Sequence, residues 1–467
     1  MQGTCVAPSF RDPAGYVVHR NDRVLRVVDE SASAELADFL SSRLAQTLLK
    51  EGVLVATEPV SPHALRDCPA GATVYEHERI PFVAYPYEWP SEMLHAAGQL
   101  TLDIAERSVH DGFGLKDASP YNVLFRGPNP VFVDVLSFER RKADDSTWLP
   151  YAQFTRNFSL PLLASKHLGM SPMSVFRTRR DGIRPHEIYT WMGPLKRFRP
   201  GILSSVTVPV WLSRFETERL YSPRSMPESQ ARYVLKSLFR RLRKNLAKVE
   251  PRDRQSQWSE YGNAPPSYTE EQLSTKRRFV ERALQRLRPR DVLDVGCNTG
   301  TFSLIAAGHG ASVVAIDADP VVVGRVWREA RSRNANILPL VVDIAWPSPA
   351  LGWNNRENAS FLDRARGAFD VVLMLALIHH LLVSERVPLE QIVSAAAELT
   401  RAHAIIEYVG PSDPMFHRLA RGRDHLHAGL NPALFENVCR KHFEIVESEQ
   451  LPACDRILYL LRRRNAA

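Results

Sequence analysis

Alternating apolar runs and helical segments fill the second half of the chain and predict a parallel sheet. Short runs rich in valine, leucine and isoleucine recur from residue 292 onward, with segments of helical spacing between them. Parallel strands that are buried on both faces give such continuous apolar runs. Strands are expected at residues 292–295, 313–316, 338–344, 369–376 and 402–409, with a closing antiparallel pair at 443–449 and 456–462. The predicted fold class is therefore α/β, a seven-stranded, mostly parallel, doubly wound sheet with helices on both faces.

A long helix is expected directly ahead of this sheet. Residues 270–287 have helical spacing, and Lys276 lies among the apolar residues that precede the first strand. Trp258, Tyr261 and Tyr268 come at or before the start of this helix. The helix is expected to cover the ligand-binding end of the sheet, with one of these aromatic residues either closing the site or packing in the interior.

The chain is long enough for a second domain. Residues 251–267, which include Gly262 and Pro265, have the turn-forming composition of a linker. We therefore expect a separate α+β domain at 1–250 and the parallel-sheet domain at 251–467.

The loop after the first strand carries the clearest chemical signal. Gly296 and Gly300 allow a sharp turn and a close approach to a ligand, and Asn298 between them tolerates left-handed backbone conformations. A G-x-G-x-x-G pattern is missing, and Asp294 places negative charge where a diphosphate would otherwise lie. Asp317 ends the second strand, where a carboxylate accepts ribose hydroxyl protons. The loop is therefore expected to hold a nucleoside that is cationic near Asp294.

These residues resemble motif I of the class I S-adenosylmethionine-dependent methyltransferases, in the form D-x-G-x-N-x-G with Asn298 in place of the usual glycine. The resemblance implies that S-adenosylmethionine is the cofactor. It also implies that the carboxylate of Asp343 accepts the adenine amino group, that Ile344 packs against the ring, and that Cys297 is a small residue in the loop. The expected cofactor residues are Asp294, Gly296, Cys297, Asn298, Gly300, Asp317, Asp343 and Ile344.

Candidates for the acceptor side follow the fourth and fifth strands. His379 and His380 come where this family places groups that face the methyl acceptor, and an imidazole can take a proton near neutral pH. Only one of the two is expected to face the site, and packing or helix capping is the alternative. Glu407 is expected to orient the substrate, or else to be a solvated carboxylate at a strand end. Asp413 and His417 are weaker candidates.

Two further segments resemble a bacterial group of methyltransferases that includes a rhizobial host-specific nodulation protein. The first is W-x-x-Y at Trp258–Tyr261, and the second is Leu351-Gly-Trp-Asn-Asn355 after Asp343. The resemblance implies the reaction class and not the acceptor, which we expect to be a small molecule or a glycan-type metabolite.

Composition narrows the other classes. The chain has 60 Lys and Arg against 52 Asp and Glu, and part of the excess lies on an amphipathic helix expected near residues 235–248. We interpret these basic residues as the solvent-exposed face of that helix, although RNA methylation stays an alternative. No metal motif is visible, no run of about 18 apolar residues predicts a membrane span, and the first residues lack a signal-peptide core, so a cytoplasmic protein is expected. Five widely spaced cysteines suggest neither disulfides nor a zinc site.

The N-terminal half contains an unexpected D-x-x-x-x-N pattern. Asp117 and Asn122 are followed by Asp134 on an apolar run, which resembles the catalytic base, metal-binding amide and metal-binding acid of protein kinases and aminoglycoside-type phosphotransferases. Residues 92–110 are the helix expected before this loop, and 15–28 a reduced hairpin. A glycine-rich phosphate loop and a paired strand lysine are missing. An active phosphotransferase, a kinase-like scaffold that binds substrate or partner, and an unrelated fold in which these residues organise a turn all stay open.

Overall fold

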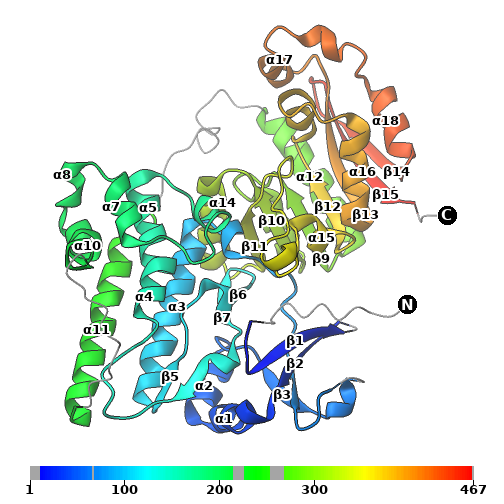
Figure 1. Cartoon of the computed structure of the whole chain (residues 1–467). Helices are drawn as coiled ribbons and strands as arrows, with labels where there is room; N and C mark the ends of the chain where they lie inside the picture. The colour runs from blue at the N-terminus through cyan, green and yellow to red at the C-terminus, as the bar shows by residue number, and fades with distance from the viewer. Residues whose placement is uncertain (1–10, 21, 66–67, 214–225, 253–267, 465–467) are drawn as a thin grey trace. The chain divides into compact units, whose positions relative to one another are not determined.

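The computed structural model describes most of the chain in two compact units (Figure 1). One unit consists of Met1–Arg252 with Leu351–Asn358, and the other of Asp253–Ala350 with Ala359–Ala467. The assignment of residues 351–358 to the first unit was not predicted. The described residues are 11–20, 22–65, 68–213, 226–252 and 268–464.

The second unit is built on one seven-stranded sheet, as predicted. Its strand order is β11-β10-β9-β12-β13-β15-β14. The first five of these strands run parallel to one another, and β15 is antiparallel to both β13 and β14. The strands are β9 (Asp291–Val295), β10 (Ser312–Asp317), β11 (Ile337–Val341), β12 (Phe369–Met374), β13 (Thr400–Val409), β14 (Phe443–Gln450) and β15 (Arg456–Arg463).

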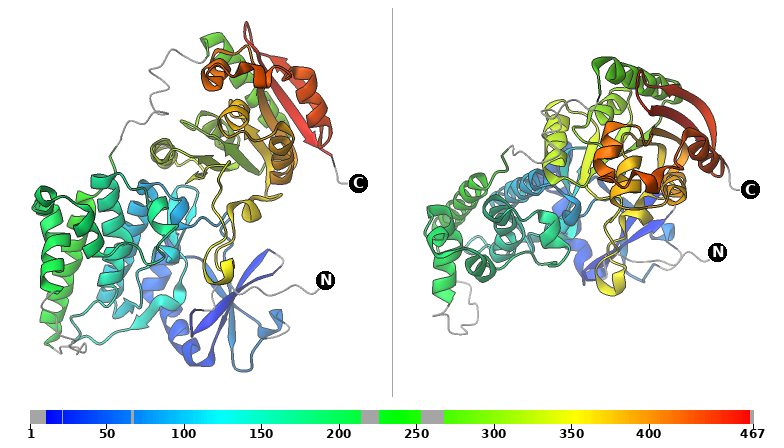
Figure 2. Two further views of the ribbon diagram at one scale, coloured as in Figure 1. Left: turned by 45° about the horizontal axis from the view of Figure 1, so that its top comes forward. Right: turned by 90° about the horizontal axis from the view of Figure 1, so that it is seen from above.

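Helices flank this sheet on both faces (Figure 2). Every residue of β11 is buried, which explains its continuous apolar sequence. The helix predicted ahead of the sheet is α12, and its residues Phe279, Val280 and Leu284 join the core formed by the strands. The helices are α12 (Glu270–Leu287), α13 (Thr301–Gly308), α14 (Pro320–Ser332), α15 (Phe361–Ala365), α16 (Leu389–Leu399), α17 (Pro414–Ala420) and α18 (Pro432–Arg440).

Register brings the carboxyl ends of the parallel strands to one edge. Val295 of β9 lies opposite Ile316 of β10 and Met374 of β12, and Met374 lies opposite Ile406 of β13. The loops that follow these strands therefore share the edge where open α/β sheets bind their ligands.

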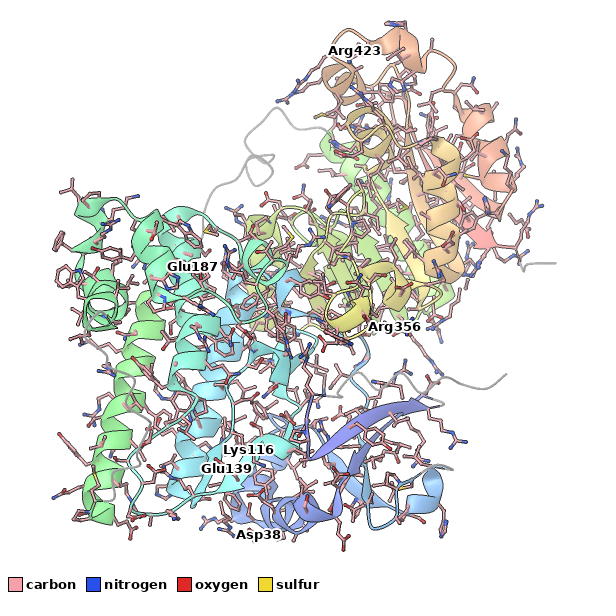
Figure 3. All side chains as sticks on the ribbon, in the orientation of Figure 1. Asp38, Lys116, Glu139, Glu187, Arg356 and Arg423 are labelled. Carbon is pink, nitrogen blue, oxygen red and sulfur yellow. The ribbon has the colours of Figure 1, made fainter. Side chains whose placement is uncertain are left out.

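The first unit is a separate α+β domain, as expected. A four-stranded sheet has the order β1-β2-β4-β3, and two antiparallel two-stranded sheets, β5 with β8 and β6 with β7, follow. Helix α1 packs near this region, where Arg140 of β8 forms an ion pair of 2.6 Å with Asp38, labelled in Figure 3. The strands are β1 (Gly15–Arg20), β2 (Arg23–Val28), β3 (Thr57–Val60), β4 (Thr73–His77), β5 (Phe113–Leu115), β6 (Val123–Arg126), β7 (Asn129–Phe132) and β8 (Phe138–Arg140).

Long and short helices complete this unit. Helix α3 lies where residues 92–110 were predicted, and α11 buries one apolar face as the 235–248 pattern indicated. Prolines divide the region after residue 170 into short helices. No helix in the described ranges is long and apolar enough to cross a membrane. The helices are α1 (Glu30–Ser41), α2 (Arg43–Lys50), α3 (Ser91–His110), α4 (Tyr151–Phe154), α5 (Leu160–Leu168), α6 (Pro172–Phe176), α7 (Pro185–Trp191), α8 (Pro194–Arg197), α9 (Pro200–Ile202), α10 (Val208–Ser213) and α11 (Glu228–Lys248).

Candidate functional site

The loop after β9 has the backbone that its glycines predicted. Gly296, Asn298 and Gly300 have φ angles of 73°, 46° and 79°, all in the left-handed region. A Cβ atom on Gly300 would lie 3.0 Å from a methyl carbon of Val326, so that position has neither the conformation nor the space for a side chain. Asparagine occupies the middle position because it adopts left-handed conformations more readily than most residues.

Asp317 is fixed by backbone amides at the end of β10. One carboxylate oxygen accepts from the Asn298 N–H and the other from the Asp319 N–H, both at 3.0 Å. Burial raises the pKa of Asp317 above its ordinary value. The carboxylate thus ties the glycine loop to the tip of the next strand and keeps lone pairs for a ligand.

Asp294 lies beneath the same loop. Its carboxylate accepts a hydrogen bond of 2.6 Å from the hydroxyl of Ser303 on α13, and the side chain is buried. Burial and nearby Asp317, opposed by the Ser303 hydrogen bond and Lys276, together raise the pKa of Asp294 to about 6. The group is mainly ionised at pH 7, so it places negative charge under the loop.

The remaining cofactor candidates surround this loop. Asp343 is exposed just beyond β11, and its carboxylate accepts from the Ala345 N–H at 2.9 Å. Ile344 beside it is half-buried. Cys297 is buried, and burial raises the pKa of its thiol, which makes it a packing residue rather than a nucleophile. Because β11, β10 and β9 are neighbours in the sheet, all of the expected cofactor residues lie at one edge.

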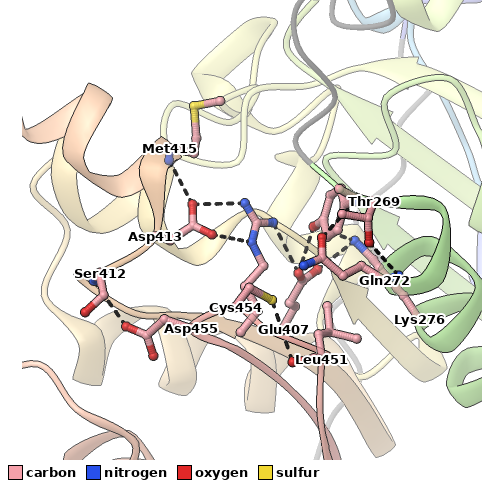
Figure 4. Close-up of polar contacts among 12 residues, drawn as sticks. Thr269, Gln272, Lys276, Glu407, Ser412, Asp413, Met415, Leu451, Cys454 and Asp455 are labelled. Atoms are coloured by element: carbon pink, nitrogen blue, oxygen red, sulfur yellow. Dashed lines mark hydrogen bonds and ion pairs between the residues drawn. The ribbon is translucent and has the colours of Figure 1, made fainter.

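A buried ionic network joins the start of α12 to β13 and β15 (Figure 4). Glu407, with none of its surface exposed, lies 2.6 Å from the ammonium of Lys276 and accepts a hydrogen bond of 2.7 Å from the Tyr268 hydroxyl. Arg456 approaches the same carboxylate at 3.3 Å and donates two hydrogen bonds, of 2.7 and 3.1 Å, to Asp413. The network contains two cations and two anions, which together are neutral.

The charges in this network support one another. Burial opposes ionisation of Glu407, but Lys276 and Arg456 outweigh it and hold the pKa of that carboxyl below its ordinary value. Burial lowers the pKa of Lys276, partly offset by Glu407, and burial and Glu407 together raise the pKa of Tyr268. Glu407 is thus neither solvated nor open to a substrate in this structure, and any orienting role would pass through Tyr268 or Lys276.

Sequence reasoning did not identify this network. Lys276 was assigned only to the covering helix, and Arg456 only to the last strand. A signal was present, because Lys276 is three and four residues before Phe279 and Val280 and therefore shares their buried helix face. Trp258 and Tyr261, proposed alternatives for closing the site, lie outside the described residues.

The two histidines occupy different environments after β12. His379 is only 1% exposed, and its Nδ1 atom has no hydrogen-bond partner among the described residues. Burial lowers the pKa of His379 to about 2 and that of the half-buried His380 to about 4. Their ring centroids are 4.3 Å apart. Both imidazoles are therefore neutral at pH 7, and His380 is the more accessible.

The weaker candidates separate as well. Asp413 belongs to the buried network, and its Oδ1 atom also accepts from the Met415 N–H at 2.8 Å, which caps α17. His417 lies on the exposed side of that helix. Asp413 is therefore placed to hold structure rather than to contact a substrate.

In the first unit, the kinase-like candidates make two separate sets of contacts. The Asn122 amide donates to Asp117 at 2.5 Å, and the Ser137 hydroxyl donates to the same carboxylate at 3.1 Å. Arg26 of β2 lies 3.6 Å from Asp134. Burial raises the pKa of Asp134 to about 6 and also raises that of Asp117.

Comparisons with known proteins identify a methyltransferase domain in the second unit. A family model described as a methyltransferase domain matches residues 268–451. The nodulation protein NoeA of Rhizobium meliloti (strain 1021) is 32% identical over 467 residues, which cover 98% of this chain and 96% of that protein.

Two solved structures are similar over less than half of the chain. The N-methyltransferase NodS from Bradyrhizobium japonicum WM9 is 16% identical, with 42% of this chain and 98% of that chain covered and a TM-score of 0.31. Magnesium protoporphyrin IX methyltransferase (ChlM) from Synechocystis PCC 6803, with bound SAH, is 18% identical, with 42% and 85% covered and a TM-score of 0.30. Scores this low give no information on the acceptor.

Identity of 32% along almost the whole of both chains has a clear consequence. The chain belongs to the family of the nodulation protein NoeA, and its second unit is a class I S-adenosylmethionine-dependent methyltransferase domain.

Proposed function

We propose that the second unit binds S-adenosylmethionine at the edge formed by β9, β10 and β11 and methylates a small-molecule or glycan-type acceptor. The observation that carries the cofactor assignment is the double hydrogen bond from the loop and strand backbone to Asp317. It fixes a carboxylate beside a glycine turn with no side chain in the way, which suits the hydroxyls of a ribose.

Other groups along this edge have complementary chemistry. Asp294 supplies negative charge for the cationic end of the cofactor, and exposed Asp343 supplies an acceptor for the adenine amino group. When bound, the cofactor provides a methyl group on a sulfonium, which needs positioning more than covalent help. His380, neutral and half-buried after β12, is the group proposed to accept the proton that the acceptor loses.

The basic helix favours a small acceptor over RNA. Arg243 of α11 pairs with Glu106 at 2.8 Å and with Asp103 at 3.4 Å, both on α3. Part of the positive charge expected for phosphate contacts is therefore neutralised within the unit. We propose a cytoplasmic site of action, since the described cysteines, Cys68, Cys297, Cys439 and Cys454, are free thiols.

Calorimetric titration of the full chain with S-adenosylhomocysteine tests the proposal. We expect binding by the wild type and at least roughly tenfold weaker binding by Asp317→Ala, because hydrogen bonds to a charged group are worth about 1.5–3 kcal/mol. Glu398→Ala is the matched control, since its carboxylate forms only an exposed pair with Arg366. Wild-type affinity in Asp317→Ala would remove the ribose assignment, and no binding by a folded wild type would refute the proposed cofactor site.

A further inference from the structure

A pocket of roughly 870 Å³ opens on the acceptor side of the second unit. One wall is the end of the π-helical turn, Leu382–Ser384, with the loop that follows it. The other is the end of α17 with the short helix Asp424–His427. Arg423, labelled in Figure 3, lies between the two helices of the second wall. The lining therefore starts two residues after the candidate base His380, and it comes from segments that follow β12 and β13 in the chain.

The lining of this pocket combines apolar and basic groups. Its apolar part contains five leucine and valine residues, and Leu426 among them has 66% of its surface exposed. Exposed leucines beside a concave surface often mark a binding site. These residues are Leu382, Val383, Val387, Leu419 and Leu426.

Three arginines line the same pocket, and no acidic side chain of its described lining neutralises their charge there. Arg386, Arg421 and Arg423 have no ion pair with any residue that the structure describes, and no acidic residue is among the described lining residues. Some exposed arginines elsewhere in this unit are paired, as Arg440 is with Glu436 at 2.8 Å. The pocket therefore has a positive potential that the protein itself leaves unbalanced.

Two of these arginines also have unusual backbone conformations. Arg386 has φ of 57° and Arg421 has φ of 49°, in the left-handed region that residues with a Cβ rarely adopt. At Arg421 this conformation is the left-handed C-cap of α17, with the Arg421 N–H donating to the His417 carbonyl oxygen. The two conformations place cationic residues on both walls of the pocket.

We propose that this pocket binds the part of the acceptor that joins an apolar body to an anionic group, either a phosphate or a carboxylate. The apolar lining suits a hydrocarbon chain, and the arginines suit the anion. The inference rests on the proposed methyl transfer, because it takes the pocket to be continuous with the acceptor side at His380.

The test uses simple amphiphiles that share one chain length, below their micellar concentrations. Decyl phosphate and decanoate carry the proposed anions, decyl maltoside is neutral and decyltrimethylammonium is cationic. Calorimetric titration of the full chain, saturated with S-adenosylhomocysteine, is expected to show the anionic amphiphiles binding at least roughly tenfold tighter than the other two. The tighter of the two anions then identifies the headgroup.

Substitutions locate the binding. The double variant Arg421→Ala/Arg423→Ala is expected to weaken the binding of decyl phosphate about tenfold and to leave the affinity for decyl maltoside unchanged. Leu426→Ser should weaken every decyl compound, and because this side chain is exposed, the fold should persist. Arg418→Ala, on the exposed side of α17 and outside the lining, is the control and should change nothing.

The outcomes separate the two proposals. Equal affinity for anionic, neutral and cationic amphiphiles, or an unchanged affinity in the double arginine variant, would overturn the pocket assignment while S-adenosylhomocysteine still binds. Loss of S-adenosylhomocysteine binding in the folded wild type would instead overturn the proposed function.

Discussion

Removal of Lys276 is the most informative perturbation of the methyltransferase unit, because it leaves a wholly buried carboxylate with one cation fewer. Lys276→Met keeps the length of the side chain and deletes the ammonium that lies 2.6 Å from Glu407. Breaking a buried ion pair by removing one partner costs about 3–5 kcal/mol. We expect Lys276→Met to lower the free energy of unfolding by about 3 kcal/mol, at the low end of that range, since Glu407 keeps its contacts with the Tyr268 hydroxyl and Arg456.

The double variant makes the prediction specific. Glu407→Gln alone removes the anion nearest to Lys276 and should also cost about 3 kcal/mol, whereas Lys276→Met/Glu407→Gln removes both charges. The two losses should therefore fall short of additivity by about 2 kcal/mol. An exposed pair in the same unit, Arg366 with Glu398 at 3.4 Å, is the control and should couple by less than about 1 kcal/mol.

Scanning calorimetry of the full chain measures these losses. The transition that S-adenosylhomocysteine raises belongs to the second unit, and a loss of 3 kcal/mol should lower its Tm by roughly 6–12 °C for a unit of this size. The pKa of Glu407 is held below its ordinary value, so the stabilisation should persist at pH 5 and disappear only on further acidification through that lowered pKa. Additive losses in the double variant would refute the buried network.

Three other sites give simpler tests. Burial raises the pKa of Asp294 to about 6, so S-adenosylhomocysteine should bind more weakly as the pH falls through 6, and Asp294→Asn should flatten that titration in calorimetry. Gly300→Ala should destabilise the second unit by about 1–2 kcal/mol of left-handed strain plus a clash with Val326 3.0 Å away, and so lower its Tm; an unchanged Tm would contradict the loop geometry. Arg26→Met should destabilise the first unit by about 2 kcal/mol. This is less than the cost of breaking a fully buried ion pair, because the Asp134 side chain is partly exposed to solvent. Because the pKa of Asp134 is raised to about 6, that loss should shrink at pH 5 in thermal melts, and an equal loss at pH 5 and 7.5 would count against the ion cluster.

Local sequence predicted the sheet because its signals are local. Each buried parallel strand is a continuous apolar run, such as Ile337–Val341, and a run of this kind needs no knowledge of its neighbours to be recognised. The turn at Gly296 and Gly300 has the same property, since positive φ and a missing Cβ are features of single residues. The order of the strands in the sheet was not predicted, because it depends on pairing between segments distant in sequence.

Long-range pairing accounts for what was not predicted. Glu407 and Lys276 are far apart in sequence, and a carboxylate at the end of a strand normally meets water. Only the folded chain shows that α12 and β15 both deliver a cation to that carboxylate. In the first unit, Asp117, Asn122 and Asp134 were visible as a motif, whereas the buried Arg26 beside Asp134 comes from a distant strand.

The buried network also connects the proposed cofactor edge with the proposed acceptor pocket. Lys276 belongs to the helix ahead of the glycine loop, and Asp413 both holds Arg456 and caps α17, which forms one wall of the pocket. A capping carboxylate that is also bidentate to an arginine has little freedom, so α17 is anchored to the sheet at its first residue. Arg421 and Arg423 therefore follow a helix whose starting position is set by the same charges that enclose Glu407.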